Sequence, residues 1–181
     1  MNRKSTLKLV LSALFLALGI VLPLLTGHIP EFGYRLLPMH LPVLLCGFIL
    51  GWPSGLVVGL LTPILSSLLT GMPPLFPVAL TMSFELAAYG FMAGLLYNLL
   101  PKKPWSLYIN LILSMIAGRI IWGFVTLALT GITGSVLTWP IFISSVVIDA
   151  IPGIIVQIVI IPLIIMALEK AKLMSRVARS S

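Results

Sequence analysis

The sequence predicts an all-α fold, an integral membrane bundle of six transmembrane helices that forms a single domain over residues 1–181. Hydrophobic residues make up 60% of the chain and charged residues only 8%, whereas soluble domains carry about 25% charged residues. The mean hydropathy is +1.20. At about 20 residues per span, a chain of this length accommodates about six helices and short loops, with no room for a soluble domain.

The basic residues predict how these helices are oriented. In a soluble protein the net charge of +7 would suggest a nucleic-acid ligand, but here the basic residues gather at the two ends and in one loop. With six spans and a cytoplasmic N-terminus, nine of the 11 Lys and Arg residues fall on the inner side. Five or seven spans would separate the two basic ends. We therefore expect an N-in, C-in topology and no nucleic-acid partner. The nine residues are Arg3, Lys4, Lys8, Lys102, Lys103, Lys170, Lys172, Arg176 and Arg179.

The first predicted helix covers about residues 9–25. It follows a basic N-terminal stretch, as in a signal peptide, but no small-x-small cleavage site closes the apolar run, so we expect the helix to be retained. Ala13 and Ala17 are four residues apart and form a small-residue pair on which another helix can pack closely. A polar segment at 26–38 then predicts an ordered loop.

The next two helices are predicted at about 39–51 and 54–70, inside a run from 38 to 77 that contains no Lys, Arg, Asp or Glu. A Gly-Trp-Pro-Ser-Gly stretch at 51–55 divides the run, because Pro and Gly interrupt a helix. Glycines recur at a spacing of four, which would bring them to one face in a helix and allow close backbone approach. They are Gly47, Gly51, Gly55 and Gly59.

The last three helices are predicted at about 78–100, 106–129 and 141–168. A proline-rich connector at 71–77 precedes the first of them, and the Pro-Lys-Lys-Pro-Trp stretch at 101–105 ends it. A loop at 131–140 precedes the third. The single cysteine, Cys46, excludes an internal disulfide and a multi-cysteine metal site.

Each of these three helices carries one charged residue in its apolar part: Glu85, Arg119 and Asp149. At a rise of 1.5 Å per residue they lie roughly 10, 15 and 12 Å below the outer ends of their helices. Charged side chains at bilayer depth are costly and mark a functional path or a structural pair. We expect the three charges to meet at one level, nearer the outer face.

Two interpretations of this level remain open. The charges could form a buried salt-bridge cluster that selects the helix packing, or a polar chamber for a small solute. Aromatic and amide neighbours favour the chamber, because an apolar cavity with a few converging polar groups is typical of a small-molecule site. His40, at the outer end of its helix, is either an interface residue or a ligand contact. The candidate substrate-binding residues are Glu85, Tyr89, Arg119, Trp122, Asp149 and His40, with Asn110, Gln157, Met82, Phe84 and Met115 as further lining.

Enzymatic interpretations find no support in the sequence. It contains no G-x-x-x-x-G-K-[ST] phosphate loop, no H-E-x-x-H metal motif and only two histidines, so catalytic residues, a cofactor and a metal are not expected. Secondary transporters usually contain internal repeats, and no convincing repeat relates the two halves of this chain.

The stretch LPVLLCGFILGWPSGLVVG at 41–59, the Ala13/Ala17 pair and the polar first outer loop carry a family resemblance. The chain resembles the substrate-binding S components of energy-coupling-factor (ECF) transporters, small six-helix proteins for vitamin uptake in bacteria. The resemblance implies a multi-pass protein of the bacterial plasma membrane that works with a transmembrane coupling (T) protein and two ATPase subunits. It also implies capture of the substrate from outside, and toppling within the bilayer to release it. The small residues implied to dock on the coupling protein are Ala13, Ala17, Gly47, Gly51, Gly55 and Gly59.

The charges bear on the substrate. Arg119 suits a carboxylate, while Glu85 and Asp149 suit hydroxyl or amine donors or hold Arg119 in place. This mixture slightly favours pantothenate, and pyridoxine-type vitamins are the alternative within the family. Two other classes stay open: a self-sufficient carrier that uses Glu85 and Asp149 as proton or sodium sites, and a structural subunit whose charges only lock its fold.

Overall fold

The computed structural model describes residues 3–26, 36–133 and 151–173, and within these ranges the regular secondary structure is entirely helical. Five of the described helices are long and apolar enough to cross a membrane, and a sixth, shorter apolar helix covers His40–Leu50. The protein is therefore a multi-pass membrane protein. Six complete spans and their orientation stay predictions.

The described helices overlap all six predicted ones. The last predicted helix, at 141–168, begins outside the described residues, and its described part is α7. The α-helices are α1 (Arg3–Thr26), α2 (His40–Leu50), α3 (Trp52–Thr70), α4 (Leu80–Leu99), α5 (Pro104–Thr133) and α7 (Ile151–Lys170), and a short π-helical turn, η1 (Leu75–Ala79), precedes α4.

The predicted break between α2 and α3 is confirmed. Gly51 adopts φ 91° and ψ 172°, which ends α2, and its N–H donates to the carbonyl of Gly47 at 3.0 Å. A positive φ of this kind is readily adopted only by glycine. α3 begins at Trp52, two residues before the predicted start, because Pro53 lies in the first helical turn, where its missing N–H has no cost.

The connector between α3 and α4 interrupts the helix, as predicted. α3 ends at Gly71 in the left-handed conformation, as a glycine C-cap requires. The backbone is not continuously helical through η1, because Phe76 is extended, with φ −120° and ψ 134°. The Ala79 N–H donates to the carbonyl of Pro74 at 2.9 Å, and this wider turn accommodates Pro77.

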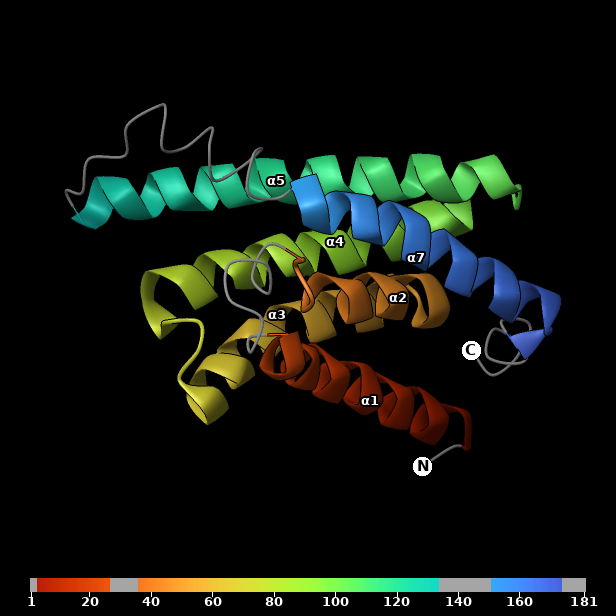
Figure 1. Cartoon of the computed structure of the whole chain (residues 1–181), viewed down its shortest axis with the longest axis horizontal. Coiled ribbons are helices and arrows are strands. Elements are labelled where there is room, and N and C mark those ends of the chain that lie inside the picture. The colour runs from red at the N-terminus through yellow and green to blue at the C-terminus, as the bar shows by residue number, and fades with distance from the viewer. Residues whose placement is uncertain (1–2, 27–35, 134–150, 174–181) are drawn as a thin grey trace.

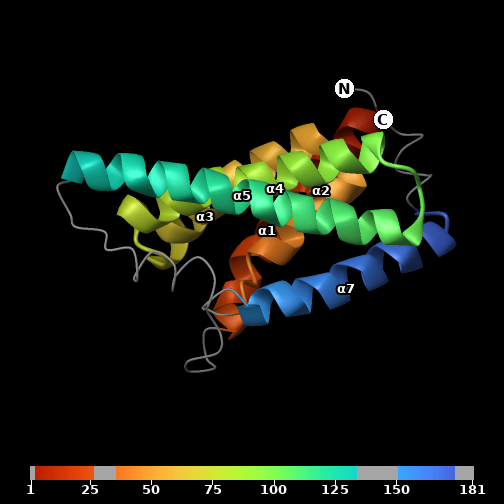
Figure 2. The same ribbon diagram turned by 90° about the horizontal axis from the view of Figure 1, so that it is seen from above.

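α4 is the central helix of the bundle. It packs against α2, α3 and α5, while α1 packs against α2 and α3, and α7 against α2 and α5. Figure 1 shows α1 along one edge and α5 along the opposite edge, with α2, α3 and α4 between them. The view from above shows α7 as a separate rod beside this group (Figure 2).

Glycines let α4 approach the α2–α3 pair closely. A Cβ added to Gly47 or to Gly55 would lie 2.4 Å from the carbonyl oxygen of Gly90, and one added to Gly59 would lie 2.3 Å from that of Leu86. Real Cβ atoms do not come so near backbone atoms. These three glycines therefore face α4 within the chain, whereas Gly51 lies in the turn.

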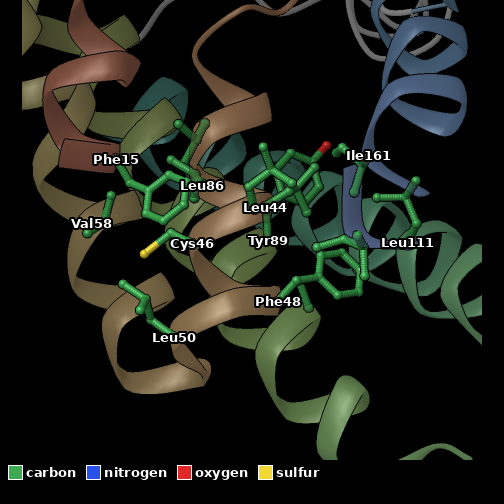
Figure 3. Packing of buried hydrophobic residues seen from close by; sticks show 14 of the residues in the cluster. Phe15, Leu44, Cys46, Phe48, Leu50, Val58, Leu86, Tyr89, Leu111 and Ile161 are labelled. Atoms are coloured by element: carbon green, nitrogen blue, oxygen red, sulfur yellow. The ribbon is translucent and has the colours of Figure 1, made fainter. Parts of the chain in front are cut away.

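The apolar core lies where α2 meets α4, α5 and α7 (Figure 3). Leu44, Leu86 and Leu111 are fully buried, and Cys46 is buried as well, as a small packing residue should be. This packing fixes the rotation of α2, α4 and α5, and so directs their polar residues toward one another.

Candidate functional site

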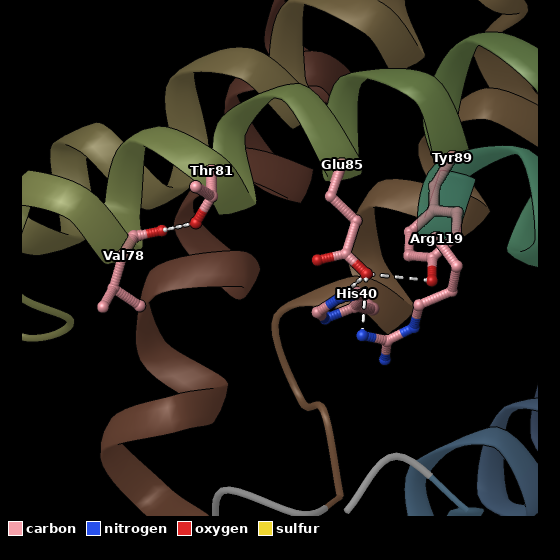
Figure 4. Close-up of polar contacts among 6 residues, drawn as sticks. All are labelled: His40, Val78, Thr81, Glu85, Tyr89 and Arg119. Carbon is pink, nitrogen blue, oxygen red and sulfur yellow. Dashed lines mark hydrogen bonds and ion pairs between the residues drawn. The ribbon is translucent and has the colours of Figure 1, made fainter. Parts of the chain in front are cut away.

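The candidate site is centred on Glu85, whose side chain is only 3% exposed. Its helix buries a stripe of residues at a spacing of four, Thr81, Glu85, Tyr89 and Ala93, because such residues share one helical face. The apolar members pack in the core, so the carboxylate of Glu85 is carried into the interior (Figure 4).

Arg119 of α5 meets this carboxylate. Its Nη1 lies 3.2 Å from Oε1 of Glu85, and its side chain is 16% exposed. The predicted convergence of the charges of these two helices is therefore confirmed as a contact. Losing one partner of such a buried pair costs about 3–5 kcal/mol, because the other charge is left unpaired.

Tyr89 holds the same carboxylate from one helical turn further along α4. Its hydroxyl donates to Oε1 of Glu85 at 3.1 Å. The ring lies against Gly118 of α5, where an added Cβ would come within 2.3 Å of the Tyr89 Cε1 atom. Gly118 thus leaves the space that the Tyr89 ring fills.

His40, the first residue of α2, brings a third element to Glu85. Its Nε2 lies 3.7 Å from Oε1 of Glu85, and its ring packs against that of Tyr89 with 5.3 Å between centroids. The residue is 2% exposed. Neither ring nitrogen has a hydrogen-bond partner among the described residues, so both could contact a ligand.

Arg119 also has unused donors. Nη1 faces Glu85, while Nε and Nη2 are buried without a hydrogen-bond partner in the described part of the chain. These two nitrogens form one edge of the guanidinium, which presents two parallel N–H groups. Such an edge matches the two oxygens of a carboxylate.

Three further buried polar atoms have no hydrogen-bond partner within the described ranges: Oγ of Ser106 and Oγ1 of Thr126 on α5, and Nε2 of Gln157 on α7. Gln157 was expected among the lining residues. Thr126 was not, although it lies seven residues, or about two turns, after Arg119 and hence on the same side of α5. Gly118 was also missed.

The other predicted residues are placed as follows. Trp122 is partly buried, nearly one turn after Arg119. Asp149 lies outside the described residues. Asn110 is used in helix packing, because its amide donates to the carbonyl of Ala93 at 2.9 Å. Phe84 is 44% exposed on the surface of α4, and a lining role is therefore not supported for it.

Of the remaining expected lining residues, Met82 is partly buried and Met115 is buried. Ala13 and Ala17 of α1, implied to dock on a coupling protein, are both exposed. Of the implied docking residues, these two alanines present an open small-residue surface.

Comparison with known proteins gives the class. A family model described as "ECF transporter, substrate-specific component" matches residues 7–165. The chain therefore belongs to this family, as its resemblance implied. No curated protein and no solved structure matches the chain. The protein is a substrate-binding membrane subunit of an ECF transporter and not an enzyme.

Proposed function

We propose that this subunit captures a water-soluble vitamin that carries a carboxylate, with pantothenate favoured, and that Arg119 binds that carboxylate. The site comprises Glu85, Tyr89, Arg119 and His40, to which we add Trp122 and Asp149. We further propose that the chain resides in a bacterial plasma membrane and delivers its substrate through a coupling protein driven by two ATPase subunits.

The unused edge of Arg119 carries this proposal. A buried donor without a partner has lost its hydration and gained nothing in return, which costs about 1–3 kcal/mol and more for a charged group. A ligand carboxylate would give Nε and Nη2 two parallel charge-assisted hydrogen bonds. Glu85 occupies Nη1 only, so it orients the guanidinium without filling the edge.

His40 supports a ligand with neutral polar groups beside the carboxylate. A neutral imidazole offers one donor and one acceptor, and both nitrogens are buried without a hydrogen-bond partner in the described ranges, with Nε2 3.7 Å from the Glu85 carboxylate. Pantothenate supplies hydroxyl and amide groups as well as a carboxylate. If Asp149 instead pairs with the free edge of Arg119, a neutral or cationic vitamin such as a pyridoxine-type compound becomes the better substrate.

The first test is mass analysis of small molecules retained by the purified full-length protein, followed by binding titrations with pantothenate and pyridoxine. We expect pantothenate to bind without ATP. In Arg119→Gln combined with Glu85→Gln, which removes both charges together, affinity should fall roughly 100-fold, since a charge-assisted bidentate contact is lost. The control is Lys170→Ala, an exposed charge at the far end of α7.

Unchanged pantothenate affinity in the double variant would remove Arg119 from the site. Tight binding of pyridoxine with no binding of pantothenate would overturn the carboxylate assignment. Transport should require added coupling protein and ATPases. Vesicles that contain this chain alone should therefore take up no substrate, and uptake by them would favour the ion-coupled carrier instead.

A further inference from the structure

A small pocket lies at the opposite end of α4 from η1, between the last turn of α4, the first turn of α5 and the end of α7. It is separate from the candidate substrate site, because Tyr97 at its wall is 12 residues, or about 18 Å, along α4 from Glu85. The lining residues are Tyr97, Leu100, Pro101, Lys102, Lys103, Ser106, Leu107, Asn110 and Glu169.

Ser106 gives this pocket an unused polar group. The residue is only 4% exposed, and its hydroxyl has no hydrogen-bond partner within the described ranges. Asn110, the other buried polar residue of the wall, already donates to Ala93 and accepts from Ser114. A buried hydroxyl without a partner carries a desolvation cost that a bound acceptor or donor would remove.

The surroundings of Ser106 favour an anion. Ser106 lies in the first turn of α5, a 30-residue helix with no acidic residue in that turn. The N-terminus of a helix carries partial positive charge, which attracts phosphate groups. In α5 this contribution comes from the helix dipole, because Pro104 has no N–H and the Ser106 N–H donates to the Lys103 carbonyl at 2.9 Å. Lys103 and Lys102 line the same pocket and add two positive charges.

Glu169 is the one acidic residue of the wall, and its charge is already engaged. The Tyr97 hydroxyl donates to its carboxylate. The Lys102 ammonium lies 3.1 Å from the centroid of the Tyr97 ring and donates to the Tyr97 carbonyl. Burial lowers the pKa of Lys102, and the nearby Glu169 opposes this shift. Lys102 and Glu169 thus largely balance each other, which leaves Lys103, Ser106 and the helix N-terminus for a ligand.

We infer that this pocket binds a phosphate group through Ser106, Lys103 and the N-terminus of α5. The two apolar spans on either side end at Leu99 and begin at Pro104, so the pocket lies at the level where lipid phosphates gather. Basic pockets between helices at this level are typical lipid headgroup sites. The exposed Trp105 beside it suits the same interface. A phospholipid headgroup is the expected source.

Native mass spectrometry of the delipidated full-length protein tests this inference, with phosphatidylglycerol, phosphatidylcholine and diacylglycerol as probes. Wild-type protein should retain both phospholipids more strongly than diacylglycerol, which lacks the phosphate. Ser106→Ala changes no charge and should lower phospholipid retention about tenfold, because a hydrogen bond to a charged group is lost. It should not impair folding, since the hydroxyl has no partner among the described residues. Thermal unfolding checks this.

Charge variants separate the pocket from general attraction to lipid. Lys103→Ala should lower phosphatidylglycerol retention, whereas Lys170→Ala, the same charge change outside the pocket lining, should alter it less than twofold. Glu169→Gln should raise it. Displacement of the lipid by millimolar inorganic phosphate would assign the site to free phosphate as well, and no displacement would assign it to lipid alone. Equal retention by wild-type and Ser106→Ala, or equal retention of diacylglycerol, would overturn the inference.

Discussion

At the residue scale, the site depends on how Tyr89 is held. Its hydroxyl reaches Glu85 because its ring fills the space that Gly118 leaves. The Glu85 carboxylate is thereby fixed between a hydroxyl and a guanidinium, so that Arg119 keeps one edge free. Gly118 contributes no chemistry of its own, and it positions the residues that do.

This role predicts the effect of Gly118→Ala. The new Cβ would lie 2.3 Å from the Tyr89 Cε1 atom, so the ring must rotate away from Glu85. We expect substrate affinity to fall about tenfold, the equivalent of one hydrogen bond to a charged group. Isothermal titration calorimetry with the vitamin that co-purifies with the protein would measure this affinity.

A double-variant comparison distinguishes positioning from general damage. In a Tyr89→Ala background, Gly118→Ala should change affinity less than twofold, because the ring that it displaces is already absent. The matched control is Gly131→Ala on the same helix, where an added Cβ meets nothing within 4 Å. An equal loss of affinity in both backgrounds would contradict the positioning role.

The contact between Glu85 and Arg119 was predictable from sequence, and the role of the glycine was not. Glu85 and Arg119 stand out because charges in apolar spans are costly and seek one another. Tyr89 follows from its spacing of four residues. The contact between Gly118 and Tyr89 depends on the rotation of α5 against α4, which the packing of side chains from four helices determines.

At the element scale, the spacing of glycines predicted a surface for close approach, but not which helix approaches. Only the structure identifies α4 as the helix that packs on these glycines. There Gly90 faces Gly55 so closely that the two backbones are in contact. The break at Gly51 was readable from Pro and Gly chemistry. The predicted start of α3 was two residues late, because a proline can mark either a helix boundary or the first helical turn, and Pro53 does the second.

The close α3–α4 approach predicts that Gly55→Ala destabilises the fold. Its Cβ would lie 2.4 Å from the Gly90 carbonyl oxygen, and neither backbone can move without repacking the bundle. Overpacking of this kind costs about 1–3 kcal/mol. Thermal or denaturant unfolding in one detergent would measure the loss.

Gly131→Ala provides the control for this measurement. Gly131 is an exposed helical glycine with open space around it, so alanine should be neutral or stabilise the helix by up to about 1 kcal/mol. Equal stability of the Gly55 and Gly131 variants would mean that α3 and α4 are less closely packed than the glycine contacts indicate.

At the scale of the whole molecule, the helices differ in how much of their surface the chain itself covers. Only 11% of the most apolar 18-residue stretch of α1 is buried, against 50% of the corresponding stretch within Leu75–Leu99, the span that includes α4. α1 therefore presents most of its surface outward. The glycine face of α2 and α3 is covered by α4, so the proposed docking surface is best sought on α1, where Ala13 and Ala17 are exposed.

Bulky substitution on α1 tests this proposed surface. Ala13→Trp and Ala17→Trp remove the small-residue face on which a second helix could pack closely, and they should prevent assembly with the coupling protein. Substrate affinity should stay within twofold of wild-type, because the site lies among α2, α4 and α5. Ala128→Trp, which enlarges an exposed alanine on α5, should permit assembly. Co-purification of each variant with the coupling protein and ATPases measures assembly. Normal complexes from both α1 variants would mean that Ala13 and Ala17 contact only lipid and are not a docking surface.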